Sequence, residues 1–254
     1  MSEKNSMKTL IAISTHRAFE ADGSNDASRE TWLRDALPPG FDYKFFVGGG
    51  SAEKKADTVS LDCGDGYEHL TYKTLGKLKW GVDQGYDFVF CAMADTYVRP
   101  ERLAACGFEQ FDAFGTFVSV GPSPKFFCGG SGYFLSQVAA KIILAGPKPV
   151  SRHAETYEDG FITSRLRHMR DMLIGDDSNL FASQGTGPRA WNQVATRHLH
   201  FRLCHELVYI PQMMRDEQRS WEDSVTAELV REARPQGRRS WWWSRSEKIT
   251  HIAS

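Results

Sequence analysis

Asp95 is the first residue whose type and position suit chemistry. It comes shortly after the apolar run at residues 88–91, which is typical of a strand buried on both faces. In an open α/β sheet, ligands bind in the crevice outside the carboxyl ends of the strands. Asp is also a favoured turn residue, and Arg99 and Pro100 follow closely, so position alone favours a ligand contact and a plain turn equally.

The adjacent carboxylates of Glu158 and Asp159 are a second candidate group. They precede a helical pattern, where a negative side chain gains from the helix dipole, so a simple first-turn charge is one interpretation. The other is a general base within hydrogen-bond reach of an acceptor hydroxyl. We expect only one of the two to face inward, because successive residues entering a helix point about a quarter-turn or more apart.

A glycine-rich segment and three histidines complete the candidates. At residues 128–133, small residues let the backbone approach a ligand closely while an aromatic ring packs on it, although a plain glycine loop has the same composition. His198, His200 and His205 are possible metal ligands, and residues 198 and 200 would share one face of a strand. A lone histidine is more often an ordinary core or surface residue.

Short β-rich runs and amphipathic segments alternate along the chain and must position these residues. This alternation predicts an α/β fold, in which a sheet is layered with helices. A helix capped by Asp26 or Ser28 is predicted to run to Leu37. The remaining predictions are strands at 9–14, 43–47, 58–61, 88–91, 116–120, 132–135 and 194–203, and helices at 70–84, 137–144 and 159–172.

Length and composition exclude several classes of protein. The 254 residues are 41% hydrophobic and 25% charged, which excludes a disordered chain and a disulfide-stapled miniprotein. The 31 basic and 32 acidic residues give no overall field toward nucleic acid. Five cysteines without a C-x-x-C pair indicate reduced thiols. The apolar run at 10–13 is too short for a leader or a membrane span, so we expect a cytoplasmic location.

Taken in order, five segments resemble glycosyltransferase family 31, the inverting β-1,3-galactosyltransferase and fringe-like group. Trp80 also stands at the distance familiar from that family. The matching segments are residues 29–32 (RETW) for R-x-T-W, 65–74 (DGYEHLTYKT) for D-x-Y-x-N-L-T-x-K-T, 93–98 (MADTYV) for D-D-D-(V/T)-(F/Y)-V, 130–136 (GSGYFLS) for G-x-G-Y-x-x-S, and 158–160 (EDG) for E-D-V.

The resemblance implies a fold and a division of the chain. Residues 1–210 would be a single GT-A (Rossmann-like) domain, with a mixed central sheet flanked by helices. Residues 211–254 would be a helical extension and a charged tail rich in tryptophan.

The resemblance also implies an activity, namely inverting transfer of a hexose from a nucleotide-sugar, a UDP-sugar by preference, to an acceptor hydroxyl such as that of a glycan. Asp159, beside Glu158, would be the catalytic base. Asp95 would hold Mn²⁺ or another divalent metal, with His198 or His200 as a further ligand. The implied donor-binding residues are Arg29, Lys73, Asp95, Gly130, Ser131, Gly132 and Tyr133.

The chain departs from the family pattern at the acidic triple. Only Asp95 remains, because Met93 and Ala94 occupy the other two positions. Metal binding would then be weak or absent, and Lys73 and Arg29 would have to neutralise the diphosphate. The family's animal members are anchored in the Golgi membrane and disulfide-bonded, whereas this sequence better fits a microbial or viral cytoplasmic relative.

Two alternatives stay open at this point. One is a non-catalytic protein that binds a sugar-nucleotide or a glycan. The other is a transferase whose acceptor is modified nucleic acid, held by the basic tail around residues 241–243 (WWW). The near-neutral overall charge weighs against the second alternative.

Overall fold

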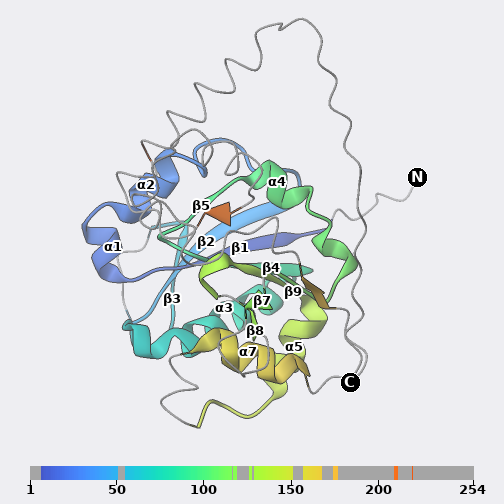
Figure 1. Ribbon diagram of the computed structural model, residues 1–254. Coiled ribbons are helices and arrows are strands. Elements are labelled where there is room, and N and C mark those ends of the chain that lie inside the picture. Colours follow the sequence, from blue (N-terminus) through green and yellow to red (C-terminus); the bar gives the residue numbers. More distant parts are fainter. Residues whose placement is uncertain are drawn as a thin grey trace, which may run out of the picture.

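The computed structural model describes residues 7–50, 55–115, 117–118, 126–127, 129–150, 157–167, 174–176, 209–210 and 219. These residues form a seven-stranded sheet in the order β10-β6-β9-β4-β1-β2-β3, with helices on both faces (Figure 1). In chain order the strands are β1 (Thr9–Ser14), β2 (Phe41–Val47), β3 (Thr58–Ser60), β4 (Phe88–Met93), β6 (Ala113–Gly115), β9 (Tyr133–Ser136) and β10 (Ile174–Asp176).

The central strand β1 is buried along its whole length, as its continuous apolar sequence predicts. Its side chains alternate between two hydrophobic clusters, because successive residues of a strand point to opposite faces. Leu10 and Ala12 join the cluster on one face, whereas Ile11 and Ile13 join the cluster on the other.

The direction of the strands decides which chain segments meet at one edge. Strands β4, β1, β2 and β3 are parallel, so their carboxyl ends lie at the same edge of the sheet. Strand β9 runs antiparallel between β4 and β6. Its first residue, Tyr133, therefore pairs with Cys91 near the end of β4, and the segment before β9 reaches the edge where the parallel strands end.

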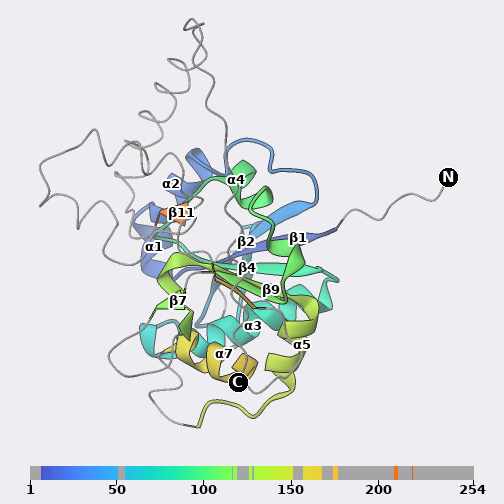
Figure 2. The same cartoon turned by 45° about the vertical axis from the view of Figure 1, so that its right-hand side comes forward.

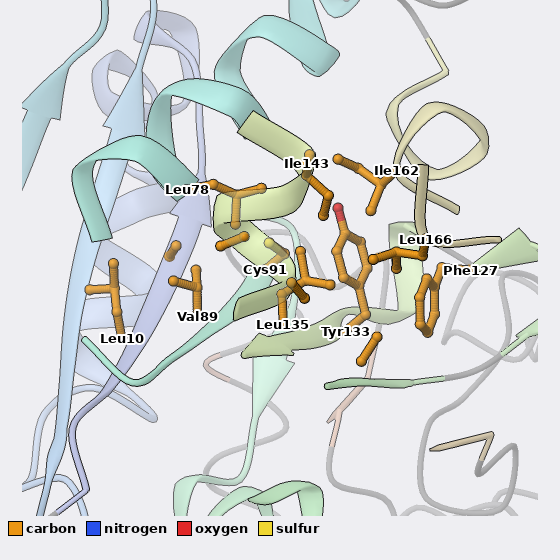
Figure 3. Close-up of a cluster of buried hydrophobic side chains, with 14 of the residues drawn as sticks. Leu10, Leu78, Val89, Cys91, Phe127, Tyr133, Leu135, Ile143, Ile162 and Leu166 are labelled. Carbon is orange, nitrogen blue, oxygen red and sulfur yellow. The ribbon is translucent and has the colours of Figure 1, made fainter. Parts of the chain in front are cut away.

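Helices α3 (Leu70–Asp83), α5 (Gln137–Ala145) and α7 (Glu158–Arg167) cover one face of the sheet. Their buried side chains include Leu78, Ile143 and Ile162, which pack with Leu10, Val89 and Tyr133 of the strands (Figure 3). Helices α1 (Arg17–Ala21), α2 (Ser24–Glu30) and α4 (Pro100–Ala104) lie on the other side, as Figures 1 and 2 show.

The remaining described elements are short. They are β5 (Tyr97–Val98), which pairs with β11 (Tyr209–Ile210), β7 (Phe117–Val118), which pairs with β8 (Phe126–Phe127), and the 3₁₀ turns η1 (Tyr67–His69), η2 (Phe108–Gln110) and η3 (Gly129–Ser131). In the part of the chain that the structure describes, no helix has the length and apolar character needed to cross a membrane.

The predicted fold class is confirmed, and so is the order of most elements, but one element prediction is wrong. The first helix does not run to Leu37, because α2 ends at Glu30 and Thr31 leaves the helical conformation. Trp32 and Leu33 then pack into a core cluster as non-helical residues. The predicted strand at 116–120 is confirmed at residues 117–118, which form β7 of the small hairpin, and its other residues lie outside the described ranges. Strand β6, which joins the main sheet just before it, was not predicted.

Some predictions lie outside the described residues. They are the strand at 194–203, His198, His200 and His205, and nearly all of the predicted extension and tail at 211–254.

Candidate active site

The carboxylate of Asp65 ties together three segments at the carboxyl edge of the parallel strands. Its Oδ2 accepts the backbone N–H of Arg17 at 2.8 Å, and its Oδ1 accepts the backbone N–H of Gly48 at 3.0 Å and the ammonium of Lys73 at 2.7 Å. Burial acts to raise the pKa of Asp65, but these hydrogen bonds outweigh it and lower the pKa. The ionised carboxylate therefore fixes the loops that follow β1 and β2.

Lys73 supports this edge from α3. Its buried ammonium donates to the carbonyl oxygens of Thr15 and Asp65 and to Asp65 Oδ1, each at 2.7 Å. An ammonium group has three protons, so these acceptors use all of its donors. The predicted contact between Lys73 and a donor diphosphate would require breaking one of these bonds.

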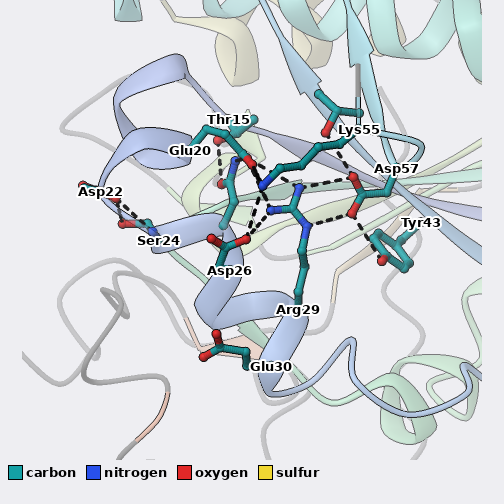
Figure 4. Close-up of polar contacts among 12 residues, drawn as sticks. Thr15, Glu20, Asp22, Ser24, Asp26, Arg29, Glu30, Tyr43, Lys55 and Asp57 are labelled. Carbon is teal, nitrogen blue, oxygen red and sulfur yellow. Dashed lines mark hydrogen bonds and ion pairs between the residues drawn. The ribbon is translucent and has the colours of Figure 1, made fainter. Parts of the chain in front are cut away.

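Arg29 lies in a separate network of charges (Figure 4). Its guanidinium contacts the carboxylates of Glu20 (3.1 Å), Asp26 (2.8 Å) and Asp57 (2.8 Å), and it lies over the ring of Phe45, 4.6 Å from the centroid. These contacts raise the pKa of Arg29 further, although burial opposes them. None of these partners is another predicted site residue, so Arg29 joins α1 and α2 to the segment before β3.

Arg17 is a cation at this edge that sequence reasoning missed. Its side chain is exposed, and its guanidinium donates to the carbonyl oxygen of Gly49 in the loop after β2. Gly49 has a positive φ of 80°, which favours glycine there. Its position in the sequence could have identified it, because Arg17 follows the end of a buried strand just as Asp95 does.

Asp95 stands just beyond the end of β4, where the sequence predicts it. The preceding residue, Ala94, donates its N–H to the carbonyl oxygen of Ser14 at 2.9 Å, which joins the exits of β4 and β1. Asp95 is partly exposed. Burial lowers the pKa of His16, while the charges of Asp65 and Asp95 act to raise it.

The described residues do not supply the ligand set that a divalent cation needs. No three His, Cys, Asp or Glu side chains come together as a metal site within the described ranges. The two positions before Asp95 hold Met93 and Ala94, which offer no oxygen side-chain ligand. Asp95 is thus a single carboxylate, and the two predicted histidine ligands lie outside the described residues.

At the other end of the site, Glu158 is buried at the start of α7. The hydroxyl of Tyr133 donates to its Oε2 at 2.5 Å. Burial raises the pKa of Glu158, although the Lys77 ammonium and the Tyr133 hydroxyl act to lower it. The buried Lys77 also donates to Ser14 Oγ at 2.8 Å and so links α3 to the end of β1.

Asp159 differs from Glu158 in being partly exposed. Its Oδ2 accepts the backbone N–H of Gly129 at 3.3 Å, and its Oδ1 accepts the backbone N–H of Gly160 at 2.7 Å. One carboxylate of the adjacent pair therefore points into the core and one points out, as expected from the helix geometry. Asp159 is therefore the more exposed carboxylate of the pair.

The glycine turn η3 brings the two ends of the site together. It lies against β4, the strand that leads to Asp95, while Gly129 contacts both carboxylates of α7. A Cβ at position 129 would lie 2.7 Å from Glu158 Oε1, so any side chain there would require the buried Glu158 carboxylate or the turn to shift. Gly132 has a φ of 72° and closes the turn by donating its N–H to the Gly129 carbonyl oxygen at 3.2 Å. The backbone of this glycine turn therefore lies close to α7, whereas the sequence predicts a close approach to a ligand.

Among solved structures, the chain aligns with the glycosyltransferase GlyE of Streptococcus pneumoniae TIGR4. The alignment has a TM-score of 0.51 and 9% sequence identity, and it covers 89% of this chain and 64% of GlyE. This chain has the GT-A fold. The likeness concerns the fold, and the chain spans less than two thirds of the length of GlyE.

Two other solved glycosyltransferases align with lower TM-scores. One is involved in the glycosylation of the major capsid of PBCV-1, with a TM-score of 0.47, 10% identity and coverage of 86% of this chain and 99% of that one. The other is an active-site mutant of LgtC, with a TM-score of 0.44, 14% identity and coverage of 90% and 97%. No protein-family model matches the sequence, and no curated protein sequence matches it.

Proposed function

We propose that this protein is a glycosyltransferase that moves a hexose from a nucleotide-sugar to an acceptor hydroxyl, with Asp159 as the general base. One observation carries the proposal. The Asp159 carboxylate is partly exposed and is held by two backbone N–H groups, beside a glycine turn that lies against β4. A fixed carboxylate at the ligand-binding edge of an α/β sheet is suited to remove a proton from a bound hydroxyl.

In the proposed reaction, Asp159 takes the proton of the acceptor hydroxyl as that oxygen attacks the anomeric carbon. The bond between the anomeric carbon and the diphosphate oxygen breaks, and its electron pair leaves with the nucleoside diphosphate. Attack from the face opposite the leaving group inverts the anomeric configuration. Inversion and a UDP-sugar donor are predictions that rest on the resemblance to family 31.

On the donor side, we assign the diphosphate contact to Arg17. Its exposed guanidinium lies at the carboxyl edge of β1 and β2, and the planar donor fork of arginine matches phosphate oxygens. Lys73 is a positioning residue in this proposal, because it holds Asp65 and the Thr15 carbonyl oxygen in place. Asp95 and residues 130–132 remain proposed donor contacts, because they lie at the same edge. Tyr133 does not fit this predicted part, since its side chain is fully buried and its hydroxyl is bonded to Glu158.

Metal dependence is a separate prediction. If Mn²⁺ binds, Asp95 with His198 or His200 would hold it, and the ion would neutralise charge on the diphosphate. No step described above passes through the metal. A nucleic-acid acceptor has no support among the described residues, so a glycan or another hydroxyl compound is the acceptor class we propose.

The first experiment is a thermal-shift titration with UDP, GDP and dTDP, each with Mn²⁺ and with EDTA. A ligand that binds only the folded state raises the melting temperature by mass action. We expect a shift with UDP that Arg17→Ala reduces. A protein that none of the three nucleotides stabilises, in either condition, would contradict the proposal.

The second experiment replaces the base. Asp159→Asn removes the proton acceptor, and general-base catalysis contributes about 10²–10⁴-fold to rate. We expect hexose transfer from UDP-hexose to fall by about that factor while the UDP shift remains. Asp83→Asn, which changes an exposed carboxylate of α3 paired with Lys79, is the matched control and should leave transfer unchanged. Equal turnover in Asp159→Asn and wild type would remove Asp159 from the mechanism.

A further inference from the structure

Two exposed aromatic side chains stand out on the described surface. The large apolar side chains that are exposed there are Met7, Tyr67, Val138, Val150 and Tyr157. Only Tyr67 and Tyr157 among these five are aromatic, and they are 65% and 49% exposed. Single exposed apolar residues are ordinary, so the significance of these two depends on whether they lie together.

The two tyrosines converge on the start of α7. Tyr67 begins η1, the turn that leads directly into α3, and the start of α3 lies beside the start of α7 in both views (Figures 1 and 2). Tyr157 immediately precedes α7, and its carbonyl oxygen accepts the N–H of Phe161 at 3.1 Å. Partial burial raises the pKa of Tyr67, and the Asp159 carboxylate, Tyr157 and Glu158 add to the effect because they lie close by.

Other tyrosines in this protein are used differently. The hydroxyls of Tyr86 and Tyr133 donate to Asp42 and Glu158, and both rings are buried in the core. The rings of Tyr133 and Phe127 stack with centroids 5.2 Å apart. Tyr67 and Tyr157 instead leave about half or more of their surface to solvent, beside the proposed base. Packing in the core therefore does not account for the positions of the Tyr67 and Tyr157 rings.

We propose that Tyr67 and Tyr157 form the acceptor subsite and take one pyranose ring of a carbohydrate, so that a ring hydroxyl reaches Asp159. The inference rests on the proposed function and names the substrate class of that site. A pyranose has an apolar face of C–H groups and a polar edge of hydroxyls. A tyrosine ring offers a matching apolar face, and it loses little conformational freedom on binding.

The charges around the subsite restrict the chemical class of the acceptor sugar. Glu68 is exposed on η1, and Asp159 is partly exposed at the start of α7. Like charges placed close together are costly when a ligand is desolvated, so a phosphorylated or carboxylated sugar would be repelled here. The acceptor class is therefore a neutral pyranoside.

The test uses saturation-transfer NMR with the full chain and three neutral probes: methyl β-D-galactopyranoside, methyl β-D-glucopyranoside and methyl α-D-mannopyranoside. We expect at least one probe to bind, with the strongest transfer to the C–H protons of one ring face. Tyr67→Ala and Tyr157→Ala should each weaken binding by about tenfold, which is the scale of losing one buried aromatic contact. Tyr67→Phe keeps the ring and should retain binding.

Val138→Ala is the matched control, because Val138 is an exposed apolar residue on α5 and has no part in the site. It should leave probe binding unchanged. Melting temperatures of all variants should stay near the wild-type value, since the substituted side chains are exposed. Probe binding that survives Tyr67→Ala combined with Tyr157→Ala would overturn the proposal, and so would binding of none of the three probes.

The UDP thermal shift separates this inference from the proposed function. If UDP stabilises the protein and no probe binds, the acceptor inference is wrong while the transferase proposal stands. If a probe binds in a tyrosine-dependent way and none of the nucleotides does, the carbohydrate subsite stands and the transferase proposal is wrong.

Discussion

The two ends of the site are held by opposite uses of charge. At the proposed nucleotide end, Asp65 is partly exposed and paired with Lys73, and its pKa is lowered despite some burial. Asp57, in the separate Arg29 network on the same side of the sheet, is likewise paired and has a lowered pKa. At the proposed base end, Glu158 is buried, and burial raises its pKa although Lys77 and Tyr133 act against it. The nucleotide end therefore gains stability from ionised carboxylates, whereas the base end bears the cost of a buried one.

The difference teaches what each carboxylate contributes to the fold. A carboxylate that hydrogen bonds keep ionised can fix several loops at once, as Asp65 fixes those after β1 and β2. A buried carboxylate contributes stability only while its few partners are in place. Substitutions at the two ends should thus differ in size and in their dependence on pH.

The largest expected effect on stability is that of Lys77→Met. This change removes a fully buried ammonium that donates to Ser14 Oγ and lies near Glu158. Removing one member of a buried charged group costs about 3–5 kcal/mol, because the remaining charge is left without compensation. Urea unfolding at pH 7 measures the loss. A decrease below about 1 kcal/mol would show that Glu158 does not depend on this ammonium.

A smaller loss is expected for Arg29→Gln at the opposite end. Glu20, Asp26 and Asp57 would lose the guanidinium that they share, but Glu20 and Asp26 keep Lys55, and all three carboxylates are partly exposed and can be hydrated. Hydrogen bonds to charged groups contribute about 1.5–3 kcal/mol, so we expect a loss of about 2 kcal/mol in urea unfolding. A loss equal to that of Lys77→Met would contradict the contrast between the two ends.

The contributions of Asp57 and Glu158 to folding stability should change in opposite directions with pH. The lowered pKa of Asp57 means that its contribution is present above the ordinary value of 3.8 and is lost as pH falls through the folded-state pKa. The raised pKa of Glu158 gives the opposite pH dependence of stability. Its contribution is present below the ordinary value of 4.5 and is lost as pH rises toward the folded-state pKa.

Unfolding free energies of Asp57→Asn and Glu158→Gln, measured against wild type from pH 3 to 8, should therefore diverge. The advantage of wild type over Asp57→Asn should shrink toward acid pH, while its advantage over Glu158→Gln should shrink toward neutral pH. Slopes of the same sign for the two variants would refute the assignment of opposite charge environments.

The smallest expected effect is that of Lys79→Met. Lys79 lies on α3 as Lys77 does, but it is exposed and pairs with Asp83 at 2.6 Å in an i,i+4 arrangement. Exposed pairs of this kind contribute about 0.3–0.5 kcal/mol. The same urea titration should find Lys79→Met within about 0.5 kcal/mol of wild type, which makes it the control for the loss at position 77.

Sequence reasoning found the fold where hydrophobic patterns were strong and local. The continuous apolar runs of β1 and β4 and the helical spacing of α3 predicted buried strands and a covering helix. The end of α2 was missed because Trp32 and Leu33 suit a helical stripe but pack as non-helical residues. Tertiary packing decided that boundary, and single-chain propensity does not contain it.

The candidate site was predicted in part. The positions of Asp95 and of the carboxylate pair followed from strand ends and helix starts. The partners of Lys73 and Arg29 did not, because Lys73 meets Thr15 and Arg29 meets Asp57 only after the chain folds. A cation in a sequence does not reveal whether protein acceptors have already taken its donors. Arg17 and Tyr67 were not predicted as site residues, because a loop sequence does not show which side chains are exposed to solvent.

The contact between Gly129 and Glu158 links two positions that are far apart in the chain. Because the Glu158 carboxylate lies within 2.7 Å of where a Cβ of residue 129 would be, a larger residue at 129 requires a rotated or shorter side chain at 158, or a displaced turn. A rotated Glu158 would disturb its hydrogen bond with Tyr133. In related chains, these two positions should therefore vary together. A relative with a side chain at the first position and a small residue at the second would have changed how its base is held, even if the base itself is kept.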